Sequence, residues 1–235
     1  MQSLARETRV SETAFLLPVS GGFKLNWFAP EGEVDLCGRA TLAAAHCLWE
    51  QQVLKQDRIA RFFTQSGSLT ARLTGDRIDL DFPADRRRIA LSMNENSVVR
   101  EALGLVPLWT GRNRRDIVVE VDGEDRVREL RPDLKRMEGL WGRGIAVTSK
   151  ARPKSGGPDF IVRFFAPKLG IPEDPVTGSA YCSLGPYWSQ KLNRKLLKAF
   201  QVSDRGGEIR IEVKSRRVLL GGKAITILRG RLSAV

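Results

Sequence analysis

The sequence predicts an α+β protein of two pseudo-symmetric halves, each a curved, mostly antiparallel sheet around a central helix. The first observation is an internal repeat, in which residues 26–49 (NWFAPEGEVDLCGRATLAAAHCLW) resemble residues 163–188 (RFFAPKLGIPEDPVTGSAYCSLGPYW). Both segments open with an aromatic-Ala-Pro step, continue through an acidic loop, and reach a Gly followed by small residues. Such self-similarity indicates two copies of one supersecondary unit.

The second observation is the pattern that surrounds each copy. Residues 12–30 and 144–167 both contain an apolar run, a turn with Ser-Gly-Gly, and a second apolar run that ends at Ala-Pro, which predicts β-hairpins. Residues 40–52 and 179–192 then carry small and apolar side chains on most sides. We expect each to form a helix largely surrounded by protein.

The chain returns to strand patterns after each predicted helix. Apolar residues alternate within residues 61–83 and 200–230, with polar or Gly-containing turns between them, which predicts antiparallel hairpins. We place one half at residues 1–100 and the other at residues 101–235. The last strand is a candidate for crossing back to the first half.

The second half has an opening strand that the first half lacks. Residues 116–122 (DIVVEVD) form that strand pattern, and a polar helix follows around residues 131–139, whereas residues 1–9 match only the helix. We therefore expect a chain that is short at its N-terminus, with an exposed sheet edge in the first half.

The composition indicates a soluble, folded protein. Hydrophobic residues make up 42% of the chain and charged residues 28%, and no apolar run approaches the roughly 18 residues of a membrane span. The N-terminus has no apolar core of a secretory signal, so we expect a cytoplasmic protein with three reduced cysteines and no membrane partner.

The positive charge raises the question of a nucleic-acid partner. The formal net charge is +12, from 39 Lys and Arg against 27 Asp and Glu. The arginines stand in separate turn-like stretches, around residues 86–88, 112–115 and 216–217, without zinc-finger spacing or interleaved aromatic residues. This scatter favours solvated loop charge over a nucleic-acid surface.

The two loops before the predicted helices are candidate binding sites. A helix that begins at Gly, with small residues behind it, presents unpaired backbone N–H groups that bind carboxylate or phosphate. Two such starts occur here, and we expect both to face one cleft that holds a small carboxylate-containing substrate. The candidate substrate-binding residues are Gly38, Arg39, Ala40, Thr41, Thr177 and Gly178.

Three residues near these loops could carry catalysis. Glu12 opens the first strand, Asp174 precedes Pro175 in the second loop, and Ser179 follows Gly178. Proline restricts the preceding residue to extended conformations, which holds Asp174 outside the helix. A carboxyl group shielded from water could both accept and donate a proton near neutrality. The alternative for Glu12 is a solvated charge at a strand end or a helix cap.

The sequence gives no sign of a metal or cofactor. His46 is the only histidine and lies in an apolar run, so a packed helix residue is favoured over a metal ligand. Cys37, Cys47 and Cys182 are dispersed, which favours structural thiols. No glycine cluster has the spacing of a nucleotide-binding loop. We expect neither a metal nor a cofactor.

These motifs resemble the phenazine-biosynthesis PhzF-like isomerase family. The resemblance rests on VSETAFLLP, the two repeated loop segments and the later GGE and LLGGKAITILRGRL, and it runs from about residue 11 to the C-terminus. It implies the diaminopimelate-epimerase-like fold and a cofactor-independent isomerase that moves a proton on a small acid. It further implies that Glu12 is the general acid/base and that Asp174 and Ser179 line the same cavity.

Two positions depart from the family pattern. Arg39 stands where the family has His in Cys-Gly-His-Ala-Thr, and Tyr181 stands where it has His in Ser-Ala-His-Cys. A permanent cation cannot relay a proton, but Arg39 could clamp a substrate carboxylate. The alternative function is therefore a non-catalytic, small-anion-binding homologue that has lost its proton relay.

The unpaired sheet edge expected in the first half also makes a homodimer plausible.

Overall fold

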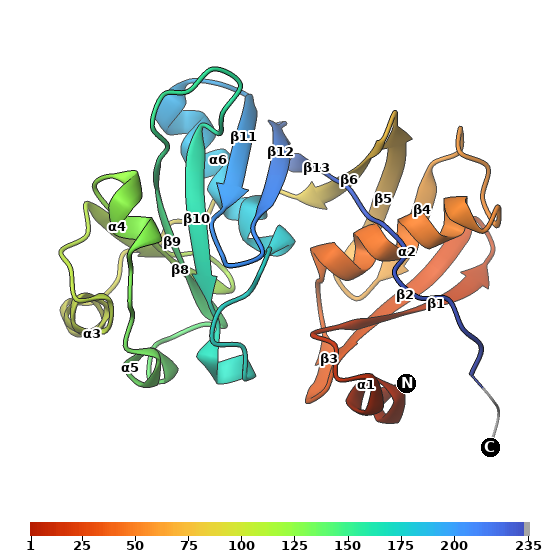
Figure 1. Ribbon diagram of the computed structural model, residues 1–235, viewed down its shortest axis with the longest axis horizontal. Helices are drawn as coiled ribbons and strands as arrows, with labels where there is room; N and C mark the ends of the chain where they lie inside the picture. The colour runs from red at the N-terminus through yellow and green to blue at the C-terminus, as the bar shows by residue number, and fades with distance from the viewer. Residues whose placement is uncertain (233–235) are drawn as a thin grey trace. The chain divides into compact units, whose positions relative to one another are not determined.

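The computed structural model describes residues 1–232, which form two compact units (Figure 1). The first unit contains Met1–Leu80 and the described residues after Leu220, and the second unit is Asp81–Leu220. The expected boundary between residues 100 and 101 falls inside helix α3 (Met93–Leu103) and differs from this division. The buried side chains of that helix, Val99, Ala102 and Leu103, pack into a core made by the second unit.

The first unit is a sheet with two helices. Its strand order is β1-β2-β4-β5-β6, and β3 also pairs with β2. The pairing is antiparallel for β1–β2, β2–β3 and β4–β5 and parallel for β2–β4. The elements are α1 (Gln2–Thr8), β1 (Thr13–Val19), β2 (Gly22–Ala29), β3 (Gly32–Val34), α2 (Gly38–Glu50), β4 (Ala60–Thr64), β5 (Gly67–Thr74) and β6 (Arg77–Pro83), the last of which crosses the unit boundary.

The second unit has a longer sheet and more helices. Its strand order is β13-β12-β11-β10-β9-β8-β7. The remaining elements are β7 (Trp109–Arg112), β8 (Asp116–Glu120), α4 (Glu124–Arg128), α5 (Leu134–Glu138), β9 (Gly144–Lys150), β10 (Phe160–Phe165), two short 3-10 turns (Pro167–Leu169 and Gly178–Ala180), α6 (Tyr181–Leu192), β11 (Leu196–Gln201), β12 (Gly207–Val213) and β13 (Arg217–Gly222).

The predicted repeat is present in the strand pairing. In the first unit an antiparallel hairpin, β1–β2, leads through α2 to β4, which pairs in parallel with β2. In the second unit the hairpin β9–β10 leads through α6 to β11, which pairs in parallel with β10. The second unit adds β8, parallel to β9, as its sequence predicted. Each unit is thus a sheet with a βαβ crossover helix.

The two crossover helices differ in burial. Every residue of α6 from Tyr181 to Trp188 is buried, and the helix contacts β11 and β12. A Cβ atom added at Gly185 would lie 2.9 Å from Ile211 Cγ2, so a larger residue there would force the Ile211 side chain to shift. In α2 the buried residues include Ala44, Ala45 and Trp49, while Ala43 is exposed. Only α6 meets the expectation of burial on most sides.

Helix α3 was not expected from the sequence, although its ends carry clear signals. Ser92 Oγ accepts a hydrogen bond from the backbone N–H of Glu95, and the Glu95 carboxylate accepts one from the backbone N–H of Ser92. These bonds form a capping box, and Gly104 ends the helix at a φ of 64°. The Ser92 hydrogen bonds hold the pKa of Glu95 below its usual range.

Removal of this cap gives a first prediction. Ser92→Ala is expected to lower the free energy of unfolding by about 1 kcal/mol, because the first turn of α3 loses a hydrogen-bond acceptor. Urea denaturation measures the change. Ser97→Ala is the matched control, since Ser97 lies in the same helix and donates only to the exposed Glu101. Equal stabilities for the two variants would contradict the assigned cap.

The segment after β13 does not form the strand expected there. Among the described residues, no strand follows Gly222, and Ile225, Ile227 and Leu228 are exposed. Side chains hold this segment to α2 instead: Thr226 Oγ1 and Arg229 Nη2 both donate to Glu50 Oε2, at 2.6 and 2.9 Å. His46 Nε2 also lies 3.1 Å from the Thr226 hydroxyl. The segment therefore belongs to the first unit, where side-chain hydrogen bonds hold it against α2.

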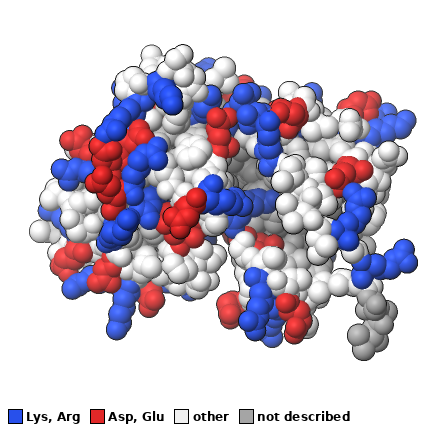
Figure 2. Space-filling view, in the orientation of Figure 1, with Lys and Arg blue, Asp and Glu red and all other residues white. Residues whose placement is uncertain are grey.

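Charged side chains are mixed on the face that Figure 2 shows. Figure 2 shows Lys and Arg interleaved with Asp, Glu and uncharged residues rather than gathered in one continuous patch. Several arginines of the second unit pair with acids, including Arg163 with Glu173 and Arg136 with Glu101. No helix among residues 1–232 is long and apolar enough to cross a membrane.

Candidate functional site

The first unit places Glu12 and Arg39 in contact. Glu12 lies directly before β1, and Arg39 lies in the first turn of α2. Arg39 Nη2 donates to Glu12 Oε2 at 2.8 Å and to Ser11 Oγ at 2.9 Å. The two charged side chains are 18% and 21% exposed, so the carboxylate is largely shielded from water. Arg39 therefore orients the carboxylate of Glu12, the residue that the sequence predicts to be the general acid/base.

Helix α2 begins where the sequence predicted, but part of its N-terminus is already occupied. Cys37 is the N-cap, and its thiol accepts a hydrogen bond from the backbone N–H of Ala40 at 3.4 Å. The backbone N–H and the hydroxyl of Thr41 both donate to the Cys37 carbonyl oxygen. Any anion at this helix start would therefore meet Gly38 and Arg39 rather than the backbone of Ala40 and Thr41.

The second unit orders the loop between Asp174 and Thr177. Both residues are 6% exposed, and the Thr177 hydroxyl donates to Asp174 Oδ2 at 2.6 Å. Gln201, the last residue of β11, donates to the Asp174 carbonyl oxygen at 2.7 Å and accepts from the backbone N–H of Thr177 at 2.9 Å. A fully buried amide thus fixes the loop.

Tyr181 supports the same amide. Its hydroxyl donates to Gln201 Oε1 at 3.2 Å. Burial raises the pKa of Tyr181 far above its usual range, and the charge of Asp174 adds to this effect. Tyr181 is therefore a neutral donor that packs in the interior. It stands where the family pattern has a histidine, and this hydrogen bond gives the position a structural use.

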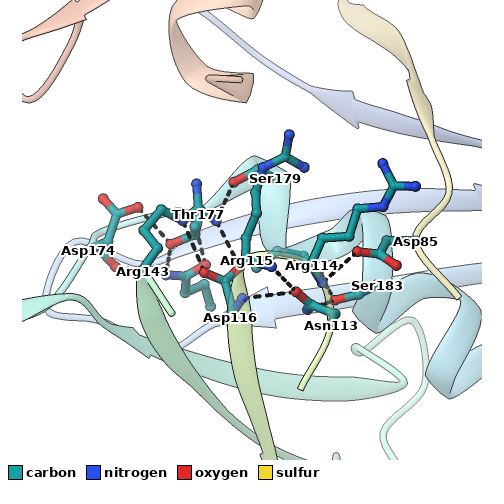
Figure 3. Close-up of polar contacts among 12 residues, drawn as sticks. Asp85, Asn113, Arg114, Arg115, Asp116, Arg143, Asp174, Thr177, Ser179 and Ser183 are labelled. Carbon is teal, nitrogen blue, oxygen red and sulfur yellow. Dashed lines mark hydrogen bonds and ion pairs between the residues drawn. The ribbon is translucent and has the colours of Figure 1, made fainter. Parts of the chain in front are cut away.

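Ser179 lies in a 3-10 turn (Gly178–Ala180) rather than in the first turn of α6, which begins at Tyr181. Its hydroxyl oxygen accepts a hydrogen bond from Arg143 Nη2 at 2.9 Å (Figure 3). Arg143 also donates to both carboxylate oxygens of Asp116, at 3.0 and 2.8 Å. Ser179 is thus tied to the starts of two strands, β8 and β9, and the expected helix start is a tighter turn.

Sequence analysis missed Arg143, Asp116 and Gln201. Asp116 opens β8 and Arg143 directly precedes β9. These strands are parallel, and Asp116 pairs with Gly144 in the register, so the two charges meet at one edge of the sheet. Opposite charges at the starts of two adjacent parallel strands were the signal that could have found them. The buried polar residue Gln201, at the end of an apolar strand, was a second signal.

The cysteines do not form a catalytic pair in either unit. Cys37 and Cys182 are buried and Cys47 is partly buried. Burial raises the pKa of the Cys182 thiol to about 12 and also raises the pKa of Cys47. A thiol that remains protonated is a poor nucleophile and base. Among the described residues, no group of three or more His, Cys, Asp and Glu side chains could hold a metal ion.

Comparison with known proteins agrees with these motifs. The profile of the PhzC-PhzF family, described as phenazine biosynthesis-like protein, matches residues 1–230. The chain belongs to this family. An uncharacterized isomerase of Halalkalibacterium halodurans is 47% identical to it over 232 residues, which cover 99% of this chain and 86% of that protein. The predicted family and the predicted isomerase class are thereby confirmed.

Solved structures agree with the predicted fold class. The crystal structure of a PhzF-family protein from Enterococcus faecalis matches with a TM-score of 0.88 at 37% identity, over 99% of this chain and 86% of that one. A probable proline racemase from Agrobacterium radiobacter matches with a TM-score of 0.59 at 10% identity, over 94% of this chain and 76% of that one. The second match reflects the fold alone, and together they confirm the α+β, epimerase-like class.

Proposed function

We propose that this PhzF-family protein is an isomerase that moves a proton on a small carboxylate-containing substrate, with Glu12 as general acid/base and without a cofactor. The observation that carries the proposal is the position of Glu12, which is shielded from water and oriented through one oxygen by Arg39. Within residues 1–232, the other oxygen, Oε1, has no hydrogen-bond partner. That oxygen is available to accept a proton from a bound compound.

In the proposed reaction, one carboxyl group both removes the proton and returns it. The ionised Glu12 removes a proton from a carbon whose neighbouring groups withdraw electrons, and the electron pair of that C–H bond moves into the conjugated system. The resulting carboxylic acid returns the proton to another carbon. No electrons leave the substrate, so the step needs no oxidant. Arg39 cannot take part as a proton carrier, because its guanidinium stays protonated.

Residues of the first unit beside Glu12 are proposed to bind the substrate. The backbone N–H groups of Gly38 and Arg39 suit a carboxylate, because such groups bind anions at helix starts. These assignments leave proton transfer to Glu12 alone.

The test is a turnover screen of small carboxylic acids that carry a C–H bond next to a carbonyl or a double bond. Purified protein is incubated with each acid, and proton NMR follows the appearance of an isomer. We expect conversion of at least one acid, unchanged after treatment with EDTA and extensive dialysis. Binding of these acids without any conversion would favour the non-catalytic alternative. Loss of activity on chelation would contradict the cofactor-free mechanism.

A further inference from the structure

Arg143 contacts three other side chains although it lies outside the proposed catalytic group. Its guanidinium donates to both oxygens of Asp116 and to the hydroxyl of Ser179, at 3.0, 2.8 and 2.9 Å. Its guanidinium carbon also lies 5.6 Å from the centre of the Phe164 ring. Contacts with Asp116, Ser179 and Phe164 together restrict the orientation of the guanidinium, and Figure 3 shows the two polar contacts.

We propose that Arg143 is a positioning residue, which acts through Ser179 by turning its hydroxyl proton away from the guanidinium. Asp116 in turn holds Arg143. The Ser179 hydroxyl is thereby left to donate to an anionic group bound beside this turn of the second unit. The part of this proposal that concerns a substrate rests on the proposed function. The orientation of the Ser179 hydroxyl and the electrostatic field at position 179 do not depend on that function.

The argument begins with hydrogen-bond roles. A guanidinium has donors only, so in its contact with Arg143 the Ser179 oxygen must be the acceptor. The serine O–H bond consequently points away from Arg143 and remains able to donate to another group. A serine without this contact would rotate among three staggered positions and could donate in any of them. The charged donor therefore excludes the position in which the hydroxyl proton would point at Arg143.

Asp116 explains why the guanidinium stays in place. Its side chain is 3% exposed, and a buried carboxylate is costly unless it is paired and hydrogen-bonded. Asn113 Oδ1 accepts from the backbone N–H of Asp116, which fixes the start of β8. Asp116 and Gly144 are partners in the register of β8 and β9, so Arg143, which directly precedes β9, lies beside Asp116. The sheet itself sets the position of the arginine.

A purely structural ion pair is the alternative, and the two roles differ in what they do at position 179. A structural pair stabilises the fold but need not change the chemistry of a group placed at residue 179. A positioning cation in hydrogen-bond contact favours the charged form of an acid placed there. A thiol is a suitable probe, because a nearby arginine lowers its pKa and so increases its reactivity.

The first experiment introduces that probe. Ser179→Cys protein is alkylated with iodoacetamide between pH 6 and pH 9, and mass spectrometry follows residue 179. We expect a thiol pKa below the ordinary value of about 8.5, and an alkylation rate at pH 7 that falls about tenfold when Arg143→Met is added. Wild-type protein is the blank; Cys182 should not interfere, because burial raises its pKa to about 12.

The controls separate a local field from general damage. Arg136→Met in the Ser179→Cys background removes an exposed, ion-paired arginine of the same unit and should leave the rate unchanged. Arg143→Lys keeps the charge and should retain most of the lowered pKa, which covers the case in which Arg143→Met fails to fold. An alkylation rate and thiol pKa unaffected by Arg143→Met, or a thiol pKa of about 8.5 while Arg143 is present, would overturn the proposal.

A second experiment connects the positioning role to turnover. With an acid that the wild-type protein converts, Ser179→Ala and Arg143→Lys should each raise KM several-fold, and the double variant should be no worse than Ser179→Ala. Additive effects would show that Arg143 does not act through Ser179. Absence of turnover in the wild-type protein would contradict the proposed function, and the thiol measurement would still decide the role of Arg143.

Discussion

Glu12→Gln is expected to lower kcat/KM by roughly 10²- to 10⁴-fold, the range that one general acid/base supplies. The amide has nearly the shape of the carboxylate, and its oxygen can still accept the hydrogen bond from Arg39. Binding of the substrate should therefore persist, while proton transfer is lost. Turnover is measured by proton NMR, and affinity for the same acid by isothermal titration calorimetry.

The control for this variant is Glu33→Gln in the same unit. Glu33 also accepts a hydrogen bond through one carboxylate oxygen, from Asn26 Nδ2 at 2.6 Å, but it lies in β3 and has no role in the proposed reaction. It should retain the wild-type rate. The melting temperature of both variants should stay near that of the wild type, because the partly exposed Arg39–Glu12 ion pair and the exposed Asn26–Glu33 hydrogen bond contribute little stability. Full activity in Glu12→Gln would exclude Glu12 as the proton carrier.

Trp188→Ala is expected to lower the free energy of unfolding by about 3 to 5 kcal/mol, as for other large aromatic residues removed from a core. Trp188 is 1% exposed and stacks on Phe160 with ring centres 5.3 Å apart. Its indole N–H donates to the Thr148 hydroxyl at 3.0 Å, so truncation also leaves a buried hydroxyl with one partner fewer. Guanidinium denaturation measures the loss.

Two further variants identify the source of that loss. Trp188→Phe keeps an aromatic ring against Phe160 and removes the indole N–H, and it should cost clearly less than Trp188→Ala. Trp141→Ala removes an indole that is 38% exposed and that contacts Arg112, so its cost should be about 1 kcal/mol. A small effect of Trp188→Ala would mean that α6 does not form the core of its unit.

The internal repeat made most of the fold predictable. Hairpin, loop, helix and returning strand recur in both halves, and the structure contains them as β1–β2–α2–β4 and β9–β10–α6–β11. The parallel pairing of β2 with β4 and of β10 with β11 follows from the helix between them, since parallel strands need such a crossover. A pattern that occurs twice is less ambiguous than either copy alone.

Features that occur once were harder to predict. Helix α3 lies in a polar stretch with only three buried residues, Val99, Ala102 and Leu103, and the expected boundary between the halves falls inside it. Residues 223–230 alternate like a strand, yet in the structure Thr226 and Arg229 bind Glu50 instead. Alternation indicates that a strand is compatible with the sequence, but not that a partner strand is available.

The site residues divide in the same way. The motif residues could be predicted as site residues because they lie beside the repeated loops. Their contacts could not be predicted from the sequence. Arg39 was expected to clamp a substrate carboxylate, and in the first unit it holds Glu12. Arg143 and Asp116 lie 27 positions apart and meet only because β8 and β9 pair in parallel. Contacts that depend on strand register can be predicted only once the fold is known, because the spacing of residues along the sequence does not reveal them.

The central claim is that the carboxyl group of residue 12 moves a proton on carbon. The most direct test uses an acid that the protein converts, labelled with deuterium at the carbon that loses its proton. During a single turnover, wild-type protein should move that label to the other carbon or release it to water, and Glu12→Gln should leave it in place. Release of the label at equal rates by both proteins would contradict the mechanism.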